Sequence, residues 1–193
     1  MRKIDYELLA RATSYYRREG YTQVEVPWLV KPIIDDMTRP HDAREFSVSS
    51  LGLHLCASGE QGFIQSLSDI GFALDKHYFT ITPCFRDNKE DDIHQLQFMK
   101  LELGLFTKKR EYVGKYTDEL MNAARYLFNN ESPSTVFSVI TDIGMDLRGK
   151  LKLGYSSDSV ELGSYGYRVV NDGYWIYGTG LALPRFSYYR ERA

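Results

Sequence analysis

Two arginines stand in sequence contexts that suit the binding of an anion. Arg86 precedes a polar run at 87–92, and Arg185 follows the glycine pair of Gly178-Thr179-Gly180. An arginine side chain stays charged and can hold phosphate oxygens through two parallel hydrogen bonds. A glycine-flanked helix start presents free N–H groups to the same kind of ligand. Each signal alone also fits a solvated surface charge, so the interpretation depends on what accompanies them.

Histidine, aromatic, hydroxyl and carboxylate side chains accompany these arginines along the chain. They are His94, Phe98 and Glu102 after Arg86, and Glu161, Ser164 and Arg168 before the glycine pair. Ala57-Ser58-Gly59-Glu60-Gln61 is a third polar group, for which a helix N-cap with its capping-box partner is a strong alternative. For His94, a solvated loop histidine is an equally good alternative.

The apolar periodicity predicts the elements that must position these residues. Helices are expected at 5–19, 58–74, 111–129 and 181–190, the last one opened by the glycine pair. Strands are expected at 22–26, 78–85, 96–106, 135–140, 150–154, 159–162, 167–170 and 175–177, with a hairpin at 45–55 and a loop at 32–44. Consecutive strands imply a mostly antiparallel sheet flanked by helices, so the expected fold class is α+β.

The composition argues against several classes of protein. The chain has 193 residues, 43% of them apolar, and a net charge of −2. One domain covering 1–193 is expected, without the apolar run of ~20 residues that a membrane span needs. The balanced charge gives no general attraction to nucleic acid. Cys56 and Cys84 form no CxxC pair, so no zinc site is indicated, and a cytoplasmic location with free thiols is expected.

In their order along the chain, these segments resemble motifs 1, 2 and 3 of the catalytic core of class II aminoacyl-tRNA synthetases. The helix and the strand that ends at Pro27 resemble motif 1, which forms the dimer interface in that family. The Arg86 hairpin resembles motif 2, and the segment 178–186 resembles motif 3. The resemblance extends from Ile4 to Tyr189. It implies an α+β fold, an ATP site and a homodimer through the Pro27 region.

The resemblance also implies roles at the ATP site. Arg86 would hold the α-phosphate and Arg185 the γ-phosphate, with the glycine pair beside the phosphates. Phe98 would stack on adenine, in a sandwich closed by Arg185, and His94 would lie near the nucleotide. Adenylation is an in-line attack of a carboxylate on the α-phosphorus, so positive charge held in place is the main help that a protein can give.

Glu161-Leu162-Gly163-Ser164-Tyr165-Gly166-Tyr167-Arg168 resembles a strand of the aspartyl- and asparaginyl-type synthetases. It is still more similar to the ammonia-dependent asparagine synthetase, a class II relative that charges no tRNA. The resemblance implies that Glu161 and Ser164 bind Mg²⁺, for which few protein oxygens are enough because the ion keeps waters. It places Arg168 at the substrate side chain, which hints at an acidic amino acid. The alternative for Glu161 is a strand-edge charge.

Motifs 2 and 3 also resemble those of the pyrrolysyl-type enzymes. That resemblance places Glu102 where the family reads its amino-acid substrate. The loop with Ser58, Glu60 and Gln61 resembles the segment that lines the amino-acid pocket in several class II families, and Ser58 and Gln61 are expected to bind the substrate.

The sequence departs from the family pattern at two positions, and no anticodon-binding domain is expected in it. Asn88 stands where motif 2 has an acidic residue, and Pro184 stands where motif 3 has Glu or Asp. We expect an adenylate-forming ligase that activates an amino acid or similar small carboxylate and transfers it to tRNA, ammonia, a carrier protein or a small amine. The alternatives are a paralogue without catalysis that binds or regulates a partner, and an unrelated α+β domain.

Overall fold

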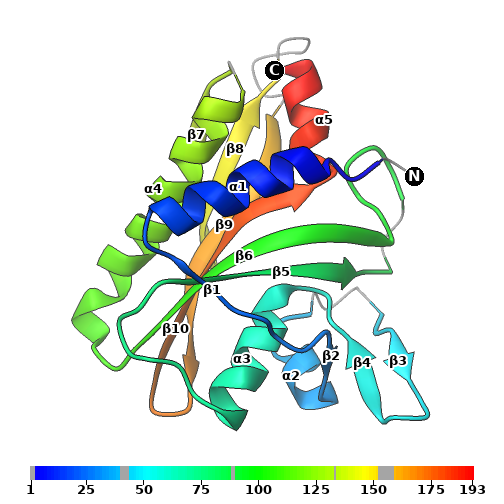
Figure 1. The fold of residues 1–193 in the computed structure, drawn as a ribbon, viewed down its shortest axis with the longest axis vertical. Coiled ribbons are helices and arrows are strands. Elements are labelled where there is room, and N and C mark those ends of the chain that lie inside the picture. Colours follow the sequence, from blue (N-terminus) through cyan, green and yellow to red (C-terminus); the bar gives the residue numbers. More distant parts are fainter. Residues whose placement is uncertain (1–2, 40–43, 88–89, 133, 152–158) are drawn as a thin grey trace.

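The computed structural model describes residues 3–39, 44–87, 90–132, 134–151 and 159–193 (Figure 1). Its helices are α1 (Tyr6–Arg18), α2 (Pro32–Asp36), α3 (Gly59–Asp69), the 3₁₀ turn η1 (Arg110–Tyr112), α4 (Val113–Glu131) and α5 (Arg185–Arg192). Its strands are β1 (Thr22–Gln23), β2 (Leu29–Val30), β3 (Ser47–Val48), β4 (Leu53–Leu55), β5 (Tyr78–Phe85), β6 (Gln97–Thr107), β7 (Val136–Thr141), β8 (Gly144–Lys150), β9 (Ser159–Val170) and β10 (Gly173–Leu183).

A seven-stranded sheet with the order β1-β5-β6-β10-β9-β8-β7 forms the centre of the fold. All its neighbouring strands pair antiparallel, except β1, which runs parallel to β5. A second sheet, β2-β4-β3, carries the expected hairpin at 45–55. The predicted α+β class with an antiparallel sheet flanked by helices is confirmed.

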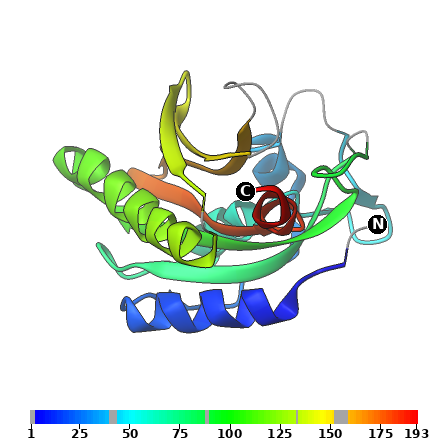
Figure 2. The same cartoon turned by 90° about the horizontal axis from the view of Figure 1, so that it is seen from above.

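Helices cover both faces of the large sheet. Helices α1, α4 and α5 lie on one face, where their apolar side chains pack on Leu101, Leu103 and Leu105 of β6 (Figures 1 and 2). Burial of each such leucine contributes about 1.5–3 kcal/mol. Helix α3 packs on the other face with Trp175 of β10. Gly104 of β6 is required there, because an added Cβ would lie 2.1 Å from the Trp175 ring.

Most element boundaries follow the sequence prediction, and their local causes are visible. Asp5 caps α1, since its Oδ1 accepts from the Leu8 N–H at 2.9 Å, and Gly20 ends it with a φ of +85°. Ser58 caps α3 through the Glu60 N–H. In the described part of the chain, no helix is both long and apolar enough to cross a bilayer.

Several predicted elements were wrong in kind or extent. The expected loop at 32–44 contains α2, which starts at Pro32, where a proline fits the first turn. The strand expected at 22–26 is paired only at Thr22–Gln23. The two strands expected at 159–162 and 167–170 are one strand, β9. Strand β8 lies at Gly144–Lys150, earlier than expected, and residues 152–154 of the predicted strand lie outside the described residues.

The most consequential error concerns the glycine pair. It was expected to open the last helix at residue 181, but it lies inside β10, and α5 begins only at Arg185. Gly178 and Gly180 allow close packing in the sheet: an added Cβ would lie 2.5 Å from the Tyr165 ring at Gly178 and 2.5 Å from Leu101 at Gly180. The glycines therefore serve a crowded strand rather than a helix start.

Candidate active site

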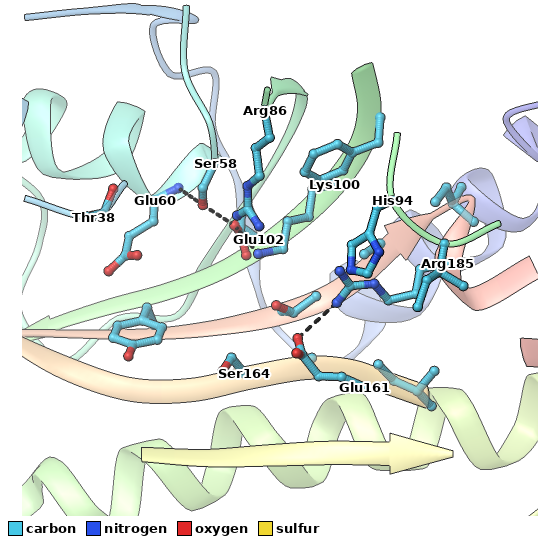
Figure 3. A pocket seen from close by; sticks show the side chains of 18 of the residues that line it. Thr38, Ser58, Glu60, Arg86, His94, Lys100, Glu102, Glu161, Ser164 and Arg185 are labelled. Carbon is cyan, nitrogen blue, oxygen red and sulfur yellow. Dashed lines mark hydrogen bonds and ion pairs between the residues drawn. The ribbon is translucent and has the colours of Figure 1, made fainter. Parts of the chain in front are cut away.

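Strand β6 supplies one wall of a pocket through simple alternation. Phe98, Lys100 and Glu102 are spaced by two residues, so they share one face of the sheet. Leu101 and Leu103 lie on the opposite face, against α1, α4 and α5. The Tyr78–Phe85 strand holds β6 in register, with Thr80 opposite Glu102. The charged side chains therefore occupy fixed positions on the pocket face, as Figure 3 shows for Lys100 and Glu102.

A register shift in β9 explains how Glu161 and Ser164 come to share a face despite a spacing of three. Asp146 of β8 pairs with Ser164, whereas Arg148 pairs with Glu161, so Leu162 is an extra residue on β9. Leu162 is buried in the core, and Glu161 and Ser164 both line the pocket. A similar shift in β10 falls between Thr179 and Leu181.

The pocket brings together most of the predicted site residues. Those that line it are Ser58, Arg86, His94, Phe98, Glu102, Glu161, Ser164, Arg168 and Arg185. Three predicted residues lie elsewhere: Gly178 and Gly180 face the helix-covered core, and Gln61 has 0% exposure beneath the pocket wall. Helix α3 explains the last of these, since Glu60, its immediate neighbour, takes the pocket side.

Arg86 lines the pocket and is held by a backbone carbonyl and an aromatic ring. Its Nε donates to the Ala57 carbonyl O at 3.0 Å, and its guanidinium carbon lies 5.3 Å from the centre of the Phe98 ring. Among the described residues it has no carboxylate within salt-bridge distance. One edge of the guanidinium is thus fixed by the backbone, and the rest can bind an anion next to a flat aromatic ring.

Arg185 and Glu161 form an ion pair across the other side of the pocket (Figure 3). The Arg185 Nη1 donates to Glu161 Oε1 at 3.0 Å. Pro184 takes the N-cap position of α5, so the proline departure from the family pattern leaves Arg185 directed into the pocket. The other departure, Asn88, lies outside the described residues.

The pair of Glu161 and Ser164 fits a Mg²⁺ that also binds a ligand's phosphates. The Ser164 hydroxyl donates to Asp146 Oδ1 at 2.6 Å, and burial raises the pKa of Asp146. The described residues contain no cluster of three or more His, Cys, Asp or Glu side chains suited to a metal. Mg²⁺ is nevertheless commonly held by one or two carboxylates, while phosphate oxygens and waters complete its coordination. Glu161 and Ser164 can supply the protein oxygens of such a site.

Glu102 is the centre of a buried polar group at the pocket floor. Its Oε1 accepts from the Ser58 hydroxyl at 2.5 Å and lies 2.7 Å from Lys100 Nζ. Gly59 makes this contact possible, since an added Cβ would lie 3.0 Å from Glu102 Cγ. The carboxylate is thereby held rigidly at the bottom of the pocket.

A second ion pair joins the buried Glu60 of α3 to the partly exposed Arg168 of β9. Arg168 Nε donates to Glu60 Oε1 at 2.8 Å, and the guanidinium also lies over the Tyr177 ring. Burial is the main cause that raises the pKa of Glu60, with the Arg168 charge opposing it. The pKa of Arg168 is raised by the Glu60 charge, although burial acts against that. The predicted substrate-side arginine therefore already has a carboxylate partner.

His94 borders the pocket from the hairpin loop. Its Nδ1 lies 2.8 Å from Asp91 Oδ2, and the Asp91 carboxylate also accepts from the N–H groups of Ile93 and His94. The hydrogen bond with the His94 side chain is the largest of the contacts that lower the pKa of Asp91 to about 2. This local turn fixes the imidazole at the pocket edge.

Sequence reasoning missed Lys100, Tyr177 and the role of Glu60. Lys100 could have been found from the alternation of β6, because it lies between two predicted pocket residues of the same face. Glu60 belongs to the loop that the resemblance places at the pocket, but the prediction of substrate binding names only Ser58 and Gln61. Tyr177 carried no sequence signal beyond a strand aromatic.

A family model described as tRNA synthetases class II (D, K and N) matches residues 2–152. The chain belongs to this family. The resemblance to the class II catalytic core that was read from the motifs is thereby confirmed. A search of curated proteins gave no match.

Solved structures of class II synthetases share the fold. The cytoplasmic serine-tRNA ligase of Naegleria fowleri, determined in complex with AMP, is 16% identical with a TM-score of 0.75. That match covers 94% of this chain and 46% of the ligase chain, so this chain spans less than half of its length. The pyrrolysyl-tRNA synthetase of Desulfitobacterium hafniense is 16% identical with a TM-score of 0.68, over 96% of this chain and 69% of that one. At such identities the likeness shows the fold alone.

Proposed function

We propose that this chain binds ATP in the pocket and activates an amino acid, or a similar small carboxylate, as its acyl-adenylate. The observation that carries the proposal is Arg86, a rigidly held guanidinium above the Phe98 ring with no carboxylate partner among the described residues. An arginine left open beside an aromatic ring suits a phosphate attached to a flat base. Membership of the class II synthetase family supports the same chemistry.

In this proposal the two arginines act at opposite ends of the triphosphate. Arg86 binds the α-phosphate and stabilises the negative charge that grows on it as the carboxylate attacks, and Arg185 binds the γ-phosphate. Phe98 stacks on adenine, with His94 at the edge of the same subsite. Glu161 and Ser164 would hold Mg²⁺, which supplies further charge neutralisation on the phosphates when it is bound.

The floor of the pocket is proposed to receive the carboxylic substrate. Ser58, Glu102 and Arg168 line it, and Glu60 and Lys100 join them in the structure. Because each cation there has a carboxylate partner, an incoming amino acid can exchange its own charged groups for those within the existing pairs.

Transfer of the acyl group is proposed to go to tRNA or to another nucleophile such as ammonia, a carrier protein or a small amine. A homodimer through the region of Pro27 is part of the proposal, and Trp28 beside it is half exposed in the single chain. A cytoplasmic location is also proposed, since Cys56 and Cys84 are free thiols.

An exchange screen tests the proposal. Labelled pyrophosphate should enter ATP in the presence of one or a few amino acids, and addition of tRNA or amine acceptors should then release AMP. Failure of all carboxylates to support exchange, together with the absence of ATP binding, would favour a synthetase-like chain that only binds or regulates a partner.

A further inference from the structure

A chain of hydrogen bonds connects Arg86 to a buried carboxylate that lies outside the pocket. The Arg86 Nε donates to the carbonyl O of Ala57, and the Ala57 N–H donates to Gln61 Oε1 at 2.7 Å. The Gln61 Nε2 donates to Asp35 Oδ1 at 2.8 Å and lies 3.3 Å from the Asp35 carbonyl O. Gln61 of α3 thus links Asp35 of α2, through the backbone of Ala57, to Arg86, which follows β5.

The carboxylate at the end of this chain is itself held from two sides. Asp35 has 1% exposure, and its Oδ2 lies 2.9 Å from His54 Nδ1 and 3.2 Å from Arg39 Nε. The other carboxylate oxygen, Oδ1, accepts from Gln61. Because both oxygens of this buried carboxylate have partners, its position is fixed. Gln61, with 0% exposure, can therefore neither rotate nor turn toward the pocket without leaving buried polar groups unpaired.

We propose that Asp35 and Gln61 are positioning residues for Arg86, acting through the backbone of Ala57. The proposal rests on the proposed function in so far as Arg86 is the phosphate arginine. Gln61 fixes the N–H side of Ala57, and Ala57 fixes the Nε side of the guanidinium, so the free edge of Arg86 faces the pocket in one orientation. This accounts for Gln61 as a residue that the polar loop motif singled out but that cannot touch a substrate.

A swap of donor and acceptor tests the connection. Gln61→Glu brings a second carboxyl group to within hydrogen-bond distance of Asp35. Once ionised it repels Asp35 and the link breaks, whereas protonated it would keep the link, so this variant is measured at a pH high enough to ionise both groups. In the double variant Asp35→Asn, Gln61→Glu, the amide at position 35 can donate to the carboxylate at position 61, which still accepts from the Ala57 N–H. Displacement of a charge-stabilising group lowers catalysis by roughly 10- to 100-fold, so we expect such a loss in kcat for Gln61→Glu and recovery of most of it in the double variant.

Gln65 offers a matched control on the same helix. Its Oε1 also accepts from a backbone N–H, that of Lys31 at 2.8 Å, and its side chain is also buried. The bond ends at α2 and does not lead to Arg86. Gln65→Glu is therefore expected to leave kcat near that of the unmodified chain.

A double-mutant cycle separates positioning from general loosening of the fold. In the Arg86→Lys background there is no Nε–H for Ala57 to hold, so Gln61→Glu should cost at most a few-fold further. A full additional loss in that background, or failure of the double variant Asp35→Asn, Gln61→Glu to recover kcat, would overturn the proposal. All assays are run well below the unfolding temperature of the least stable variant.

A spectroscopic measurement decides the same question without any enzymatic activity. In ¹H–¹⁵N spectra of the arginine Nε groups, the Arg86 signal is assigned by its loss in Arg86→Lys. Gln61→Glu should speed exchange of that proton with water by at least about tenfold, the equivalent of one lost hydrogen bond, whereas Gln65→Glu should not. Unchanged exchange in Gln61→Glu would contradict the positioning role, even in a chain for which no carboxylate substrate is found.

Discussion

Arg86 and the paired cations of the pocket differ in how their charge is balanced. Arg86 is held by a backbone carbonyl and an aromatic ring and has no carboxylate partner among the described residues, whereas Arg168 is joined to Glu60 and Lys100 to Glu102. An unpaired guanidinium in a pocket gains most when an anion binds, while a paired one gains only by exchange of partners. In the proposed function, the unpaired Arg86 receives the α-phosphate, Arg185 exchanges Glu161 for the γ-phosphate, and the pairs of Glu60 and Glu102 receive the smaller zwitterionic substrate.

The largest expected effect on activity is that of removing Arg86, the unpaired arginine. Arg86→Ala should lower ATP–pyrophosphate exchange by roughly 10²–10³-fold, because a fixed donor to the developing charge is lost. Arg11→Ala, which removes an exposed ion pair with Glu131 on the helical side of the sheet, is the control and should leave exchange unchanged. Equal exchange in the Arg86 variant and the control would contradict the distinction between Arg86 and the paired cations of the pocket.

In the ion pair of Arg168 and Glu60, removal of the arginine should lower stability more than removal of the carboxylate charge. Arg168→Leu leaves Glu60, with 8% exposure, as a buried carboxylate without its cation, and the free energy of unfolding at neutral pH should fall by about 3 kcal/mol. Glu60→Gln keeps an acceptor for an arginine side chain that is 31% exposed, and should cost about 1 kcal/mol or less. Urea denaturation of the two variants measures the difference.

The pH dependence of the same variants follows from the raised pKa of Glu60. A carboxyl whose folded pKa is raised binds its proton more tightly in the folded state, so stability falls as pH rises through that pKa. The deficit of Arg168→Leu should therefore be largest at neutral pH and shrink in acid. A deficit that stays the same in acid would mean that the lost Arg168 charge does not act through ionised Glu60.

Removal of the Phe98 ring, which lies beside Arg86, should weaken the binding of ATP. Phe98→Ala should raise the Kd for ATP about tenfold, since stacking of a base on an aromatic ring contributes about 1–3 kcal/mol. Phe98→Tyr keeps the ring and serves as the control. Calorimetric titration with ATP measures both, and an unchanged Kd in the alanine variant would place adenine elsewhere.

The smallest effect is expected at the edge of the pocket. Asp91, whose pKa is lowered to about 2 mainly by its hydrogen bond with His94, stabilises the hairpin loop when it is ionised. That contribution is present above the ordinary pKa of an aspartate and is lost as pH falls toward 2. Because the pair is exposed, Asp91→Asn should cost less than about 1 kcal/mol, with a thermal-unfolding difference that is present at pH 6 and disappears near pH 2. A difference that persists near pH 2 would show that ionisation of Asp91 contributes nothing.

Regular periodicity was enough to predict the part of the site that lies on β5 and β6. Alternation over 78–85 and 96–106 predicts the hairpin, and with it the positions of Arg86, Phe98 and Glu102. The order of the motifs predicts that Glu161 approaches them from a later strand and Arg185 from the last helix. These features depend on local patterns and on the family resemblance, which the sequence contains.

Register shifts and close packing could not be predicted in the same way. The extra residue at Leu162 sets which neighbours face the pocket, and it follows from pairing with β8 rather than from any local preference. Gly178 and Gly180 were assigned to a helix start because the Tyr165 and Leu101 side chains that crowd them are distant in sequence. The exchange of roles between Glu60 and Gln61 likewise depends on Asp35, which α2 brings to the far side of α3.

The most direct test of the central claim follows an oxygen atom. A carboxylate substrate labelled with ¹⁸O in both oxygens attacks the α-phosphorus, pyrophosphate leaves, and one labelled oxygen bridges the acyl group and AMP. Transfer of the acyl group to a nucleophile then breaks the acyl–oxygen bond, so mass spectrometry should find one ¹⁸O in the released AMP. Appearance of the label in inorganic phosphate, or turnover that leaves AMP unlabelled, would contradict activation at the α-phosphate beside Arg86.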